Sequence, residues 1–549
     1  MKESIAKRLA AAQPTMLDRA ISWLSPATGL ERQRARQTMA LTGGYDAGSR
    51  SSRSMRNMRT AAMDADAASL YDLPTLRERS RDLVRNAPLA TGAVNTVVTN
   101  VVGSGLVFQS RLDRAVLDMD DDEASEWESN TEREFALFAA NCDIERTSTL
   151  SDLQELAFRS TLENGDCFVL LTQARYPGSP YSLKLQLIEA DRVSNPKLTP
   201  DSAHLSGGVE KGPGGAPAFY HVAERHPGDM RPPFKFQWRA IPAFTPSGRR
   251  NVLHLFSKSR IGQTRGIPYL APVIEPLKQL DDYTEAEVTA AVIAGLYTVF
   301  VQSPDGMGDL SADGIISSDP ESKKEVSLGK GTIVNLDPGQ VITAPNPGRP
   351  NSAFDPFVQA ILRQIGVALE IPFEILIKHF TASYSAARAA LLEAWKFFYR
   401  RRAWLVARLC EPVYEAWMDE AVATGRIIAP GYFEDPIIRQ AWLGCRWIGP
   451  ARGMIDETKE VDAARMKVEL GISTRADAAA ELNGSDFESN VSQLKKEKDM
   501  LTQAGLMPTV TPWGTAPTSP APGGDSPKNN PDQQDQADQP DQQDIPEEN

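Results

Sequence analysis

Apolar residues change their spacing along the chain, and the changes predict a mixed fold of helices and strands. Helical spacing runs over residues 76–102 and stops at Gly103-Ser104-Gly105, where a turn is expected. Over 150–257 the apolar residues form short runs separated by turns rich in Gly, Pro and Asn. The clearest runs are 167–171, 183–188 and 252–256. We therefore predict an α+β region that contains a mostly antiparallel sheet.

A helix and a small β module are predicted next. Helical spacing starts near residue 268, and Pro276 either kinks this helix or marks its real start, because a proline ring clashes with the preceding turn. β-like runs follow at 298–302 and 331–336, on either side of a connection rich in Gly, Asp and Ser. The sequence therefore predicts a β module inserted after the helix.

More helical segments complete the folded part of the chain. A helix is predicted over 356–369, and after a loop over 373–382 a long helical stretch covers 383–424, which Pro412 should divide. Residues 452–505 are also expected to be helical and strongly charged. One apolar stripe of the long stretch predicts core packing: Leu391, Trp395, Phe398, Leu405, Leu409, Val413 and Trp417.

The two ends of the chain carry opposite charge. Residues 1–60 hold eleven Lys and Arg against four Asp and Glu, whereas residues 508–549 hold one Lys against eight Asp and Glu. The net charges of these two segments cancel, so the residues between them carry the whole net charge of −13. We expect residues 1–65 to form a flexible basic arm. Its partner is either nucleic acid or an acidic protein, or the arm has no partner and is only a solvated tail. Residues 507–549 are expected to form a disordered acidic tail.

Length and composition narrow the class of protein. A chain of 549 residues with 41% apolar content should form several packed regions. The longest uncharged apolar stretch, 288–301, is too short to span a bilayer, and the first residues lack the apolar core of a secretory signal. The four cysteines lie far apart without a CxxC pair, as expected for reduced thiols in the cytosol.

Signatures of catalysis are missing from the sequence. Gly329-Lys330-Gly331-Thr332 lacks the upstream glycine and the Lys-Ser/Thr pair of a phosphate-binding loop, and the glycines near Gly212 sit in a hairpin-like turn. The five histidines have no metal-ligand spacing, and no GxSxG motif occurs. The acidic run 118–123 lacks EF-hand spacing and is expected to be a solvated helix start. We predict no cofactor, no metal and no enzyme activity.

Six short stretches occur in a fixed order along the chain. They are Asp82-Leu83-Val84-Arg85-Asn86, Asn164-Gly165 followed by an acidic residue, Arg192-Val193-Ser194-Asn195-Pro196, Gly262-Gln263-Thr264-Arg265-Gly266, Ser383-Tyr384-Ser385 with Ala387-Arg388-Ala389, and Trp447-Ile448-Gly449. In these stretches and their order the sequence resembles the lambda family of bacteriophage portal proteins, which are head-tail connectors. The resemblance extends over most of residues 75–470.

The resemblance implies a portal fold and a ring oligomer, typically a dodecamer, around a DNA channel. Carried over part by part, it divides the chain as follows: a basic flexible arm (1–65), an α+β wing (66–267), a first stem helix (268–295), a small β clip (296–351), a second stem helix (352–370), a tunnel loop (371–384), the long helix with the rest of the wing (385–450), a helical crown (451–506) and the acidic tail (507–549).

The implied function is a channel at a capsid vertex for DNA packaging and ejection. The implied partners are the terminase large subunit, the major capsid or scaffold protein, a head-tail completion protein and double-stranded DNA passing without sequence specificity, with no membrane. The implied location is the virion, and the host cytoplasm during assembly. Two alternatives stay open: a phage assembly enzyme such as a maturation protease or nuclease, and another head-tail adaptor.

Particular residues are expected to act in this channel. Four acidic residues of the first stem helix are expected to contribute to its surface: Asp281, Asp282, Glu285 and Glu287. Some should face the lumen, where they would limit the adhesion of DNA phosphates, and some should face a neighbouring subunit. In the alternative, they form an ordinary solvated face. Lys378, His379 and Phe380 are expected near the tip of the tunnel loop, close to DNA. In the alternative, Phe380 packs between subunits with Ile375, Leu376 and Ile377.

The remaining residues singled out by the resemblance are expected to be structural. They are Arg85, Asn86, Gln263, Arg265, Tyr384 and Arg388. For Arg265, a turn held by charge-assisted hydrogen bonds is preferred over contact with DNA.

Overall fold

A computed structural model describes residues 16–41, 55, 57–58, 60–232, 237–295, 300–302, 341–343, 353–380 and 383–506. The predicted strand at 331–336, most of the predicted clip and the acidic tail lie outside these residues. Within the described residues no helix reaches the length and apolar content needed to cross a membrane.

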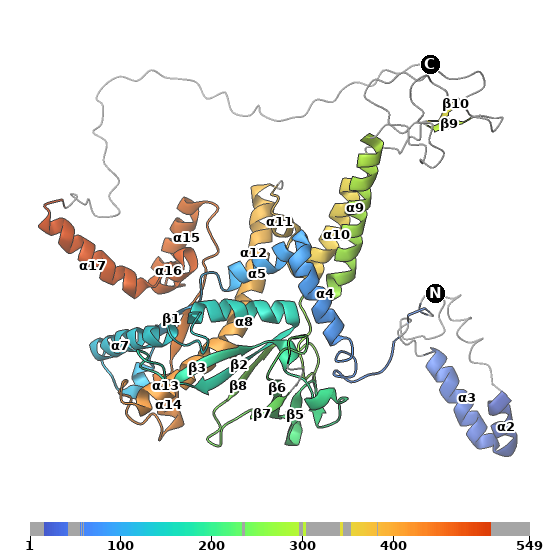
Figure 1. Cartoon of the computed structure of the whole chain (residues 1–549), viewed down its shortest axis with the longest axis horizontal. Coiled ribbons are helices and arrows are strands. Elements are labelled where there is room, and N and C mark those ends of the chain that lie inside the picture. Colours follow the sequence, from blue (N-terminus) through green and yellow to red (C-terminus); the bar gives the residue numbers. More distant parts are fainter. Residues whose placement is uncertain are drawn as a thin grey trace.

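Helices and small antiparallel sheets build the described chain (Figure 1). The helices are α2 (Met16–Leu24), α3 (Pro26–Leu41), α4 (Leu73–Asn86), α5 (Pro88–Val101), α6 (Arg114–Leu117), α7 (Asp121–Ala139), α8 (Leu150–Asn164), α9 (Ile274–Gly295), α10 (Phe354–Ala368), α11 (Phe373–Ile377), α12 (Tyr384–Leu405), α13 (Glu411–Ala423), α14 (Pro436–Trp442), α15 (Glu457–Glu469), α16 (Arg475–Asn483) and α17 (Phe487–Gln503). The strands are β1 (Val107–Ser110), β2 (Asp166–Gln173), β3 (Leu183–Ile188), β4 (Leu205–Ser206), β5 (Val209–Lys211), β6 (Pro217–Ala223), β7 (Trp238–Pro242), β8 (Val252–Phe256), β9 (Phe300–Gln302), β10 (Val341–Thr343) and β11 (Cys445–Ile448).

Two sheets form the centre of the body, and the predicted antiparallel pairing is confirmed. One sheet has the order β3-β2-β8 and the other β4-β5-β6-β7. Side chains alternate across β2, as they must in a strand. Val169 and Leu171 join the large core under the helices, whereas Phe168 and Leu170 join a second core with Tyr220 of the other sheet. The three-stranded sheet is therefore buried on both faces.

The single helix predicted over 76–102 is wrong, because two helices cover this segment. Helix α4 ends at Asn86 and α5 starts at Pro88. Ala87 between them is extended, with φ −98° and ψ 114°. A proline disfavours the helical conformation in the residue before it, so Pro88 forces the break and then fits the first position of α5.

Helices α9 and α10 lie side by side as a rod that projects from the body (Figure 1). Helix α9 starts at Ile274, so Pro276 falls in its first turn and marks the start of the helix, as one of the two predicted options held. Tyr283 of α9 packs on Phe354 and Phe357 of α10, with ring centroids 5.6 and 5.1 Å apart. The short strands β9 and β10 follow α9 and precede α10, and they pair with each other.

The connection from the rod to the long helix is more ordered than the predicted loop. Residues Phe373–Ile377 form the short helix α11, so the prediction of an uninterrupted loop over 373–382 is wrong. Ile375 and Leu376 of α11 are buried in the large core. These two apolar side chains anchor the helix in the body of their own subunit, which explains why the segment folds.

The long helix crosses the core of the body as predicted. Helix α12 continues through one π-helical turn, η6 (Val406–Cys410), into α13. Pro412 follows the π turn directly. Since proline has no N–H to donate and its ring displaces the preceding turn, the wider π turn accommodates it. The predicted stripe is buried from Trp395 to Trp417, and Leu391 packs on the same core from a partly exposed position.

The C-terminal helices α15, α16 and α17 confirm the helical prediction for 452–505. Two polar contacts tie them to the small sheet β1-β11: Gln109 Nε2 donates to Asp486 Oδ1 at 2.7 Å, and Arg446 pairs with Asp477 at 2.9 Å. Asp486 also caps the start of α17.

Two helices in the basic arm, α2 and α3, were not predicted. They pack on each other, and Asp18 of α2 is buried between them near Arg32 of α3, with Nε and Oδ1 3.5 Å apart. The sequence interpretation rested on the scarcity of large apolar residues over 1–65 and overlooked the helical spacing of Leu17, Ile21 and Leu24.

Candidate functional site

A buried charge cluster joins two of the six family-like stretches and contacts a third through the carbonyl oxygen of Val193. We use this name for Arg77, Asp166, His254 and Arg265. Asp166 opens β2 and is fully buried. Arg265 Nε donates to its Oδ2 at 2.6 Å, and Arg77 Nη2 donates to its Oδ1 at 3.0 Å. The cluster therefore fixes the start of a core strand to α4 and to the turn that precedes the rod.

Arg265 has protein acceptors on all sides of its guanidinium. Besides Asp166, Nη1 donates to the carbonyl oxygens of Val193 at 2.7 Å and Gly207 at 2.6 Å, and Nη2 donates to that of Ala190 at 2.7 Å. The residue is 2% exposed. This set of charge-assisted hydrogen bonds is what a structural arginine makes, and it leaves little of the side chain for a ligand.

Gly165 and Gly266, the neighbours of Asp166 and Arg265 in sequence, allow two backbone segments to approach each other closely. A Cβ atom on Gly266 would lie 1.9 Å from the carbonyl oxygen of Gly165, and Gly165 has φ +89°. No other residue fits two backbones this close, and a positive φ strains residues that carry a Cβ. The stretches Asn164-Gly165 and Arg265-Gly266 therefore meet backbone to backbone.

The pKa values in the cluster follow from burial and charge. Burial alone would raise the pKa of Asp166, but the charges of Arg265 and Arg77 outweigh it and hold that pKa far below its ordinary value. Burial lowers the pKa of His254 to about 4, although Asp166 Oδ2 lies 3.3 Å from its Nε2. The imidazole, stacked between Phe168 and Phe256 with centroids 4.1 Å away, is therefore neutral at pH 7.

The other residues expected to be structural lie in varied surroundings. Gln263 is buried and donates to the carbonyl of Arg265 at 2.7 Å, whereas Asn86 donates to Asp82 at 2.7 Å on the surface. Arg85 is exposed and reaches Asp82 only at 3.8 Å. Tyr384 begins α12, and Arg388 is partly buried one turn further along.

The predicted acidic residues lie along α9. Asp281, Asp282 and Glu285 are exposed and Glu287 is partly exposed. Lys278 pairs with Asp282 one turn away. The rod also leaves apolar side chains uncovered, among them Val288 and Val292 on α9 and Phe357 on α10. A single subunit therefore does not bury both faces of the rod.

Lys378, His379 and Phe380 are all exposed at the end of α11. Lys378 adopts the left-handed conformation, with φ 54°, and the amide of His379 donates to the carbonyl of Glu374 at 3.1 Å, which closes the helix. Because Ile375 and Leu376 are buried within the subunit, the alternative in which they pack between subunits is wrong for these two residues.

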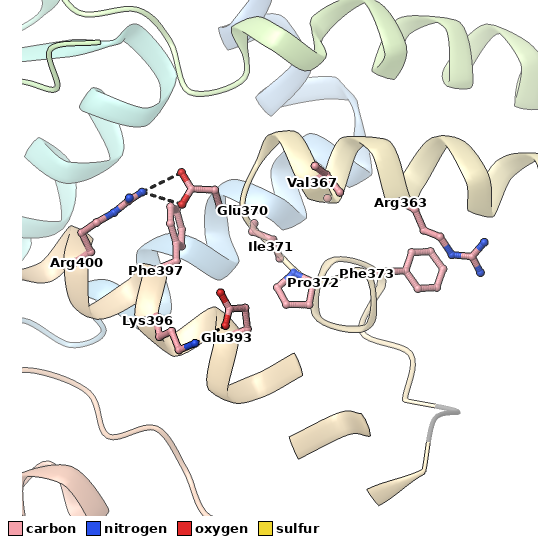
Figure 2. A pocket seen from close by; sticks show the side chains of 11 residues that line it. Arg363, Val367, Glu370, Ile371, Pro372, Phe373, Glu393, Lys396, Phe397 and Arg400 are labelled. Atoms are coloured by element: carbon pink, nitrogen blue, oxygen red, sulfur yellow. Dashed lines mark hydrogen bonds and ion pairs between the residues drawn. The ribbon is translucent and has the colours of Figure 1, made fainter. Parts of the chain in front are cut away.

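A groove of about 670 Å³ lies between the rod and the long helix, next to α11 (Figure 2). Arg400 of α12 holds both carboxylate oxygens of Glu370, at 2.9 and 2.8 Å, and Lys396 pairs with Glu393 at 2.6 Å. Val367 on its rim is 81% exposed. The groove thus combines apolar walls with ion pairs that are open to solvent.

One group of potential metal ligands occurs among the described residues, at Glu189, Asp191 and His226. The guanidinium of Arg81 already contacts Asp191 and lies 3.2 Å from Glu189 Oε1. A positive charge in this position neutralises the carboxylates and opposes a cation, so the group is best described as an ion-pair network.

Comparison with known proteins decides the family. Residues 51–402, more than half of the chain, match the family described as phage portal protein, lambda family. The chain belongs to this family. Within it, portal protein B of Escherichia phage lambda is 29% identical over 488 residues, covering 84% of this chain and 90% of that protein. The portal protein of Escherichia phage N15 is 27% identical over the same length, with the same coverage.

Among solved structures, this lambda-family chain is similar to one in the neck of a native gene transfer agent particle. The identity is 12%, the match covers 75% of this chain and 93% of that chain, and the TM-score is 0.43. A TM-score of this size is too low to carry an argument about shape.

The sequence interpretation of this portal-family chain missed several residues of these sites. Arg77 and His254 of the charge cluster stand in no motif, and Asp166 was noted only as an acidic residue after Asn164-Gly165. Its place between a glycine and an apolar run was a usable signal, because a carboxylate that opens a core strand needs a buried partner. The ion pair of Glu370 with Arg400 spans thirty residues and left no such signal.

Proposed function

We propose that this chain is the portal protein of a bacteriophage: copies of it form a closed ring, a dodecamer in the particle, through which DNA is packaged and ejected at one capsid vertex. The observation that carries the proposal is the family match over residues 51–402. The family is one of structural proteins, which is compatible with a chain that has no catalysis of its own.

The rod supports ring formation on physical grounds. Its uncovered apolar residues, such as Val288, Val292 and Phe357, need a partner surface in water. Heterologous contacts between identical subunits close into a ring when a whole number of the rotations that relate one subunit to the next makes a full turn. We therefore propose α9 and α10 as the stem helices, packed around a channel by their neighbours.

The other parts keep the roles that the resemblance implies. We propose the two central sheets with α4–α8 and α12–α14 as the wing, the segment between α9 and α10 as the clip, and α15–α17 as the crown. The charge cluster joins the wing to the turn before the stem helix α9. If this connection between the wing and the stem is rigid, contacts made by the clip would keep the stem in a fixed orientation.

The segment around Lys378 is the proposed tunnel loop. In a ring, one lysine from every subunit would form a positive girdle facing the DNA backbone. Contact with phosphate does not depend on sequence, as transport of any genome requires. The acidic side chains at Asp281 and Glu285 would line the stem and keep DNA from adhering to it.

The proposal places the chain in the virion, and in the host cytoplasm during assembly. Its proposed partners are the terminase large subunit as the motor, the major capsid or scaffold protein, a head-tail completion protein and the DNA in the lumen. A packaging assay tests this function: proheads assembled with the chain should protect DNA from nuclease when terminase and ATP are added. Protection by proheads assembled without the chain would contradict the proposal.

A further inference from the structure

Helix α2 of the basic arm presents an apolar face that nothing in the described part of the chain covers. Trp23 is 86% exposed, and Met16, Leu17 and Leu24 are exposed as well. The helix packs on α3 through its polar side instead, where Asp18 and Ser22 lie. A tryptophan and three large apolar residues on one short helix form a recognition face, because burying them in a partner's groove would release much apolar surface from water.

An apolar groove at the far edge of the body offers a matching surface. This α7–α14 groove, of about 380 Å³, is lined by residues of α6, α7, α14 and the loop after α13. Trp127 and Trp442 form its floor, with centroids 4.8 Å apart. Their indole N–H groups donate to the carbonyls of Ile428 at 2.8 Å and Pro430 at 3.1 Å, so the rings present apolar surface without an unmet donor.

The chain segment that contributes Val116 and Trp127 to the groove is acidic, whereas the arm is basic. Between the groove residues Val116 and Trp127 the chain holds six Asp and Glu and no Lys or Arg. Asp118, Asp122 and Glu123 are all exposed. Residues 1–60 carry eleven Lys and Arg against four acidic residues, and Arg32 and Arg34 on α3 are exposed next to α2. Complementary charge steers such partners together and selects against like-charged ones.

We propose that α2 of one subunit docks its apolar face in the α7–α14 groove of a neighbouring subunit. The arm joins the body near Met63, whose carbonyl accepts from Arg260, and Figure 1 shows α7 and α14 at the opposite end of the body from α4. The 21 residues between Leu41 and Met63 can span at most roughly 70 Å, so the position of α2 is not restricted to the body of its own subunit. The inference rests on the proposed ring, because it needs a second copy held close by.

Photo-crosslinking in the full-length chain tests the docking. Trp23 is replaced by p-benzoylphenylalanine, and rings are assembled from a mixture of unlabelled and ¹⁵N-labelled chains, checked by electron microscopy and irradiated. We expect cross-links from position 23 to the groove, at or beside Ile428, Met119 and Trp442, that join one chain of each isotope. Raising the salt concentration should lower their yield.

A groove variant and a matched control complete the test. Ile428→Asp places a charge on a groove residue that is 76% exposed, so the fold is retained, and the cross-link yield should fall roughly tenfold or more. Ile261→Asp makes the same change at a fully exposed isoleucine outside the groove and should leave the yield unchanged.

The outcomes separate this inference from the proposed function. Two results would overturn the docking between subunits and leave the portal function standing. One is normal rings without cross-links at the groove, and the other is cross-links whose two ends always carry the same isotope and therefore lie within one chain. An equal loss of yield in both Ile→Asp variants would also overturn it. Failure to form rings at all would count against the portal function and the docking together.

Discussion

Arg265 and Asp166 are ninety-nine residues apart in the sequence, yet Nε of one lies 2.6 Å from Oδ2 of the other with both side chains buried. The pair sits where the strand β2 begins and where the chain turns toward α9. A buried ion pair of this kind contributes little net free energy but is costly to break, because the remaining charge stays buried without a partner.

We predict that Arg265→Ala destabilises the protein by about 3–5 kcal/mol, because it leaves Asp166 with less neutralising charge. Arg265→Lys should also destabilise it, since lysine lacks the planar fork that reaches Asp166 and three carbonyls at once. Urea denaturation measures both. The control is Arg85→Ala, an arginine of another family-like stretch that is 71% exposed, with an expected change below about 0.5 kcal/mol. Equal midpoints for Arg265→Ala and Arg85→Ala would contradict the structural role.

The cluster also predicts how stability depends on pH. The pKa of His254 falls from 6.5 to about 4 on folding, so between these values the unfolded chain binds a proton that the folded chain does not. The contribution of His254 to stability should therefore fall as the pH drops from 6.5 toward 4. Asp166, whose pKa is depressed, adds a further loss only below pH 3.8.

His254→Gln removes the titrating group and should flatten the stability curve between pH 6.5 and 4, measured by urea denaturation at each pH. The exposed His204, replaced in the same way, is the control. A curve for His254→Gln as steep as that of the wild type would show that His254 does not cause this dependence.

Lys378→Glu should leave ring formation intact and impair the packaging or retention of DNA, because the proposed girdle would then repel phosphate. A packaging assay with nuclease protection measures this. Lys197→Glu is a matched control: Lys197 is also exposed and also has a positive φ, at 57°, but lies in the body. Normal packaging by Lys378→Glu would remove Lys378 from the mechanism.

Replacing the four acidic residues of α9 by amides should make assembled rings bind double-stranded DNA more tightly, with binding that weakens steeply as salt rises. The variant carries Asp281→Asn, Asp282→Asn, Glu285→Gln and Glu287→Gln. The control carries amides at four exposed carboxylates of the body: Glu78, Glu126, Glu145 and Glu224. If both variants bind DNA alike, the acidic face of α9 is an ordinary solvated surface.

Much of the fold was predictable because burial leaves a periodic signal. The strands β2, β3 and β8 appeared as apolar runs, and the long helix appeared as a stripe from Leu391 to Trp417. The break at Pro88 was missed because the apolar spacing continues across it, although the proline itself was a usable signal. Helix α11 was missed because five residues are too few to show a period.

The sites were less predictable, since they depend on contacts between distant segments. The resemblance pointed to Arg265, but its partners Asp166, Val193 and Gly207 come from three other stretches of the chain. No spacing rule brings these together, because sheet pairing and the approach of Gly165 to Gly266 set the geometry. The roles of Lys378 and of the acidic residues on α9 remain predictions about an assembly of many copies.

The central claim is that copies of this chain close into a ring with α9 and α10 around a channel. Cryo-electron microscopy of the purified full-length chain tests it most directly. The account predicts closed rings with a central hole, with the α9–α10 rods packed side by side around the channel and Lys378 pointing into the lumen. Monomers at every concentration, or rings with the rods on the outer surface, would contradict it.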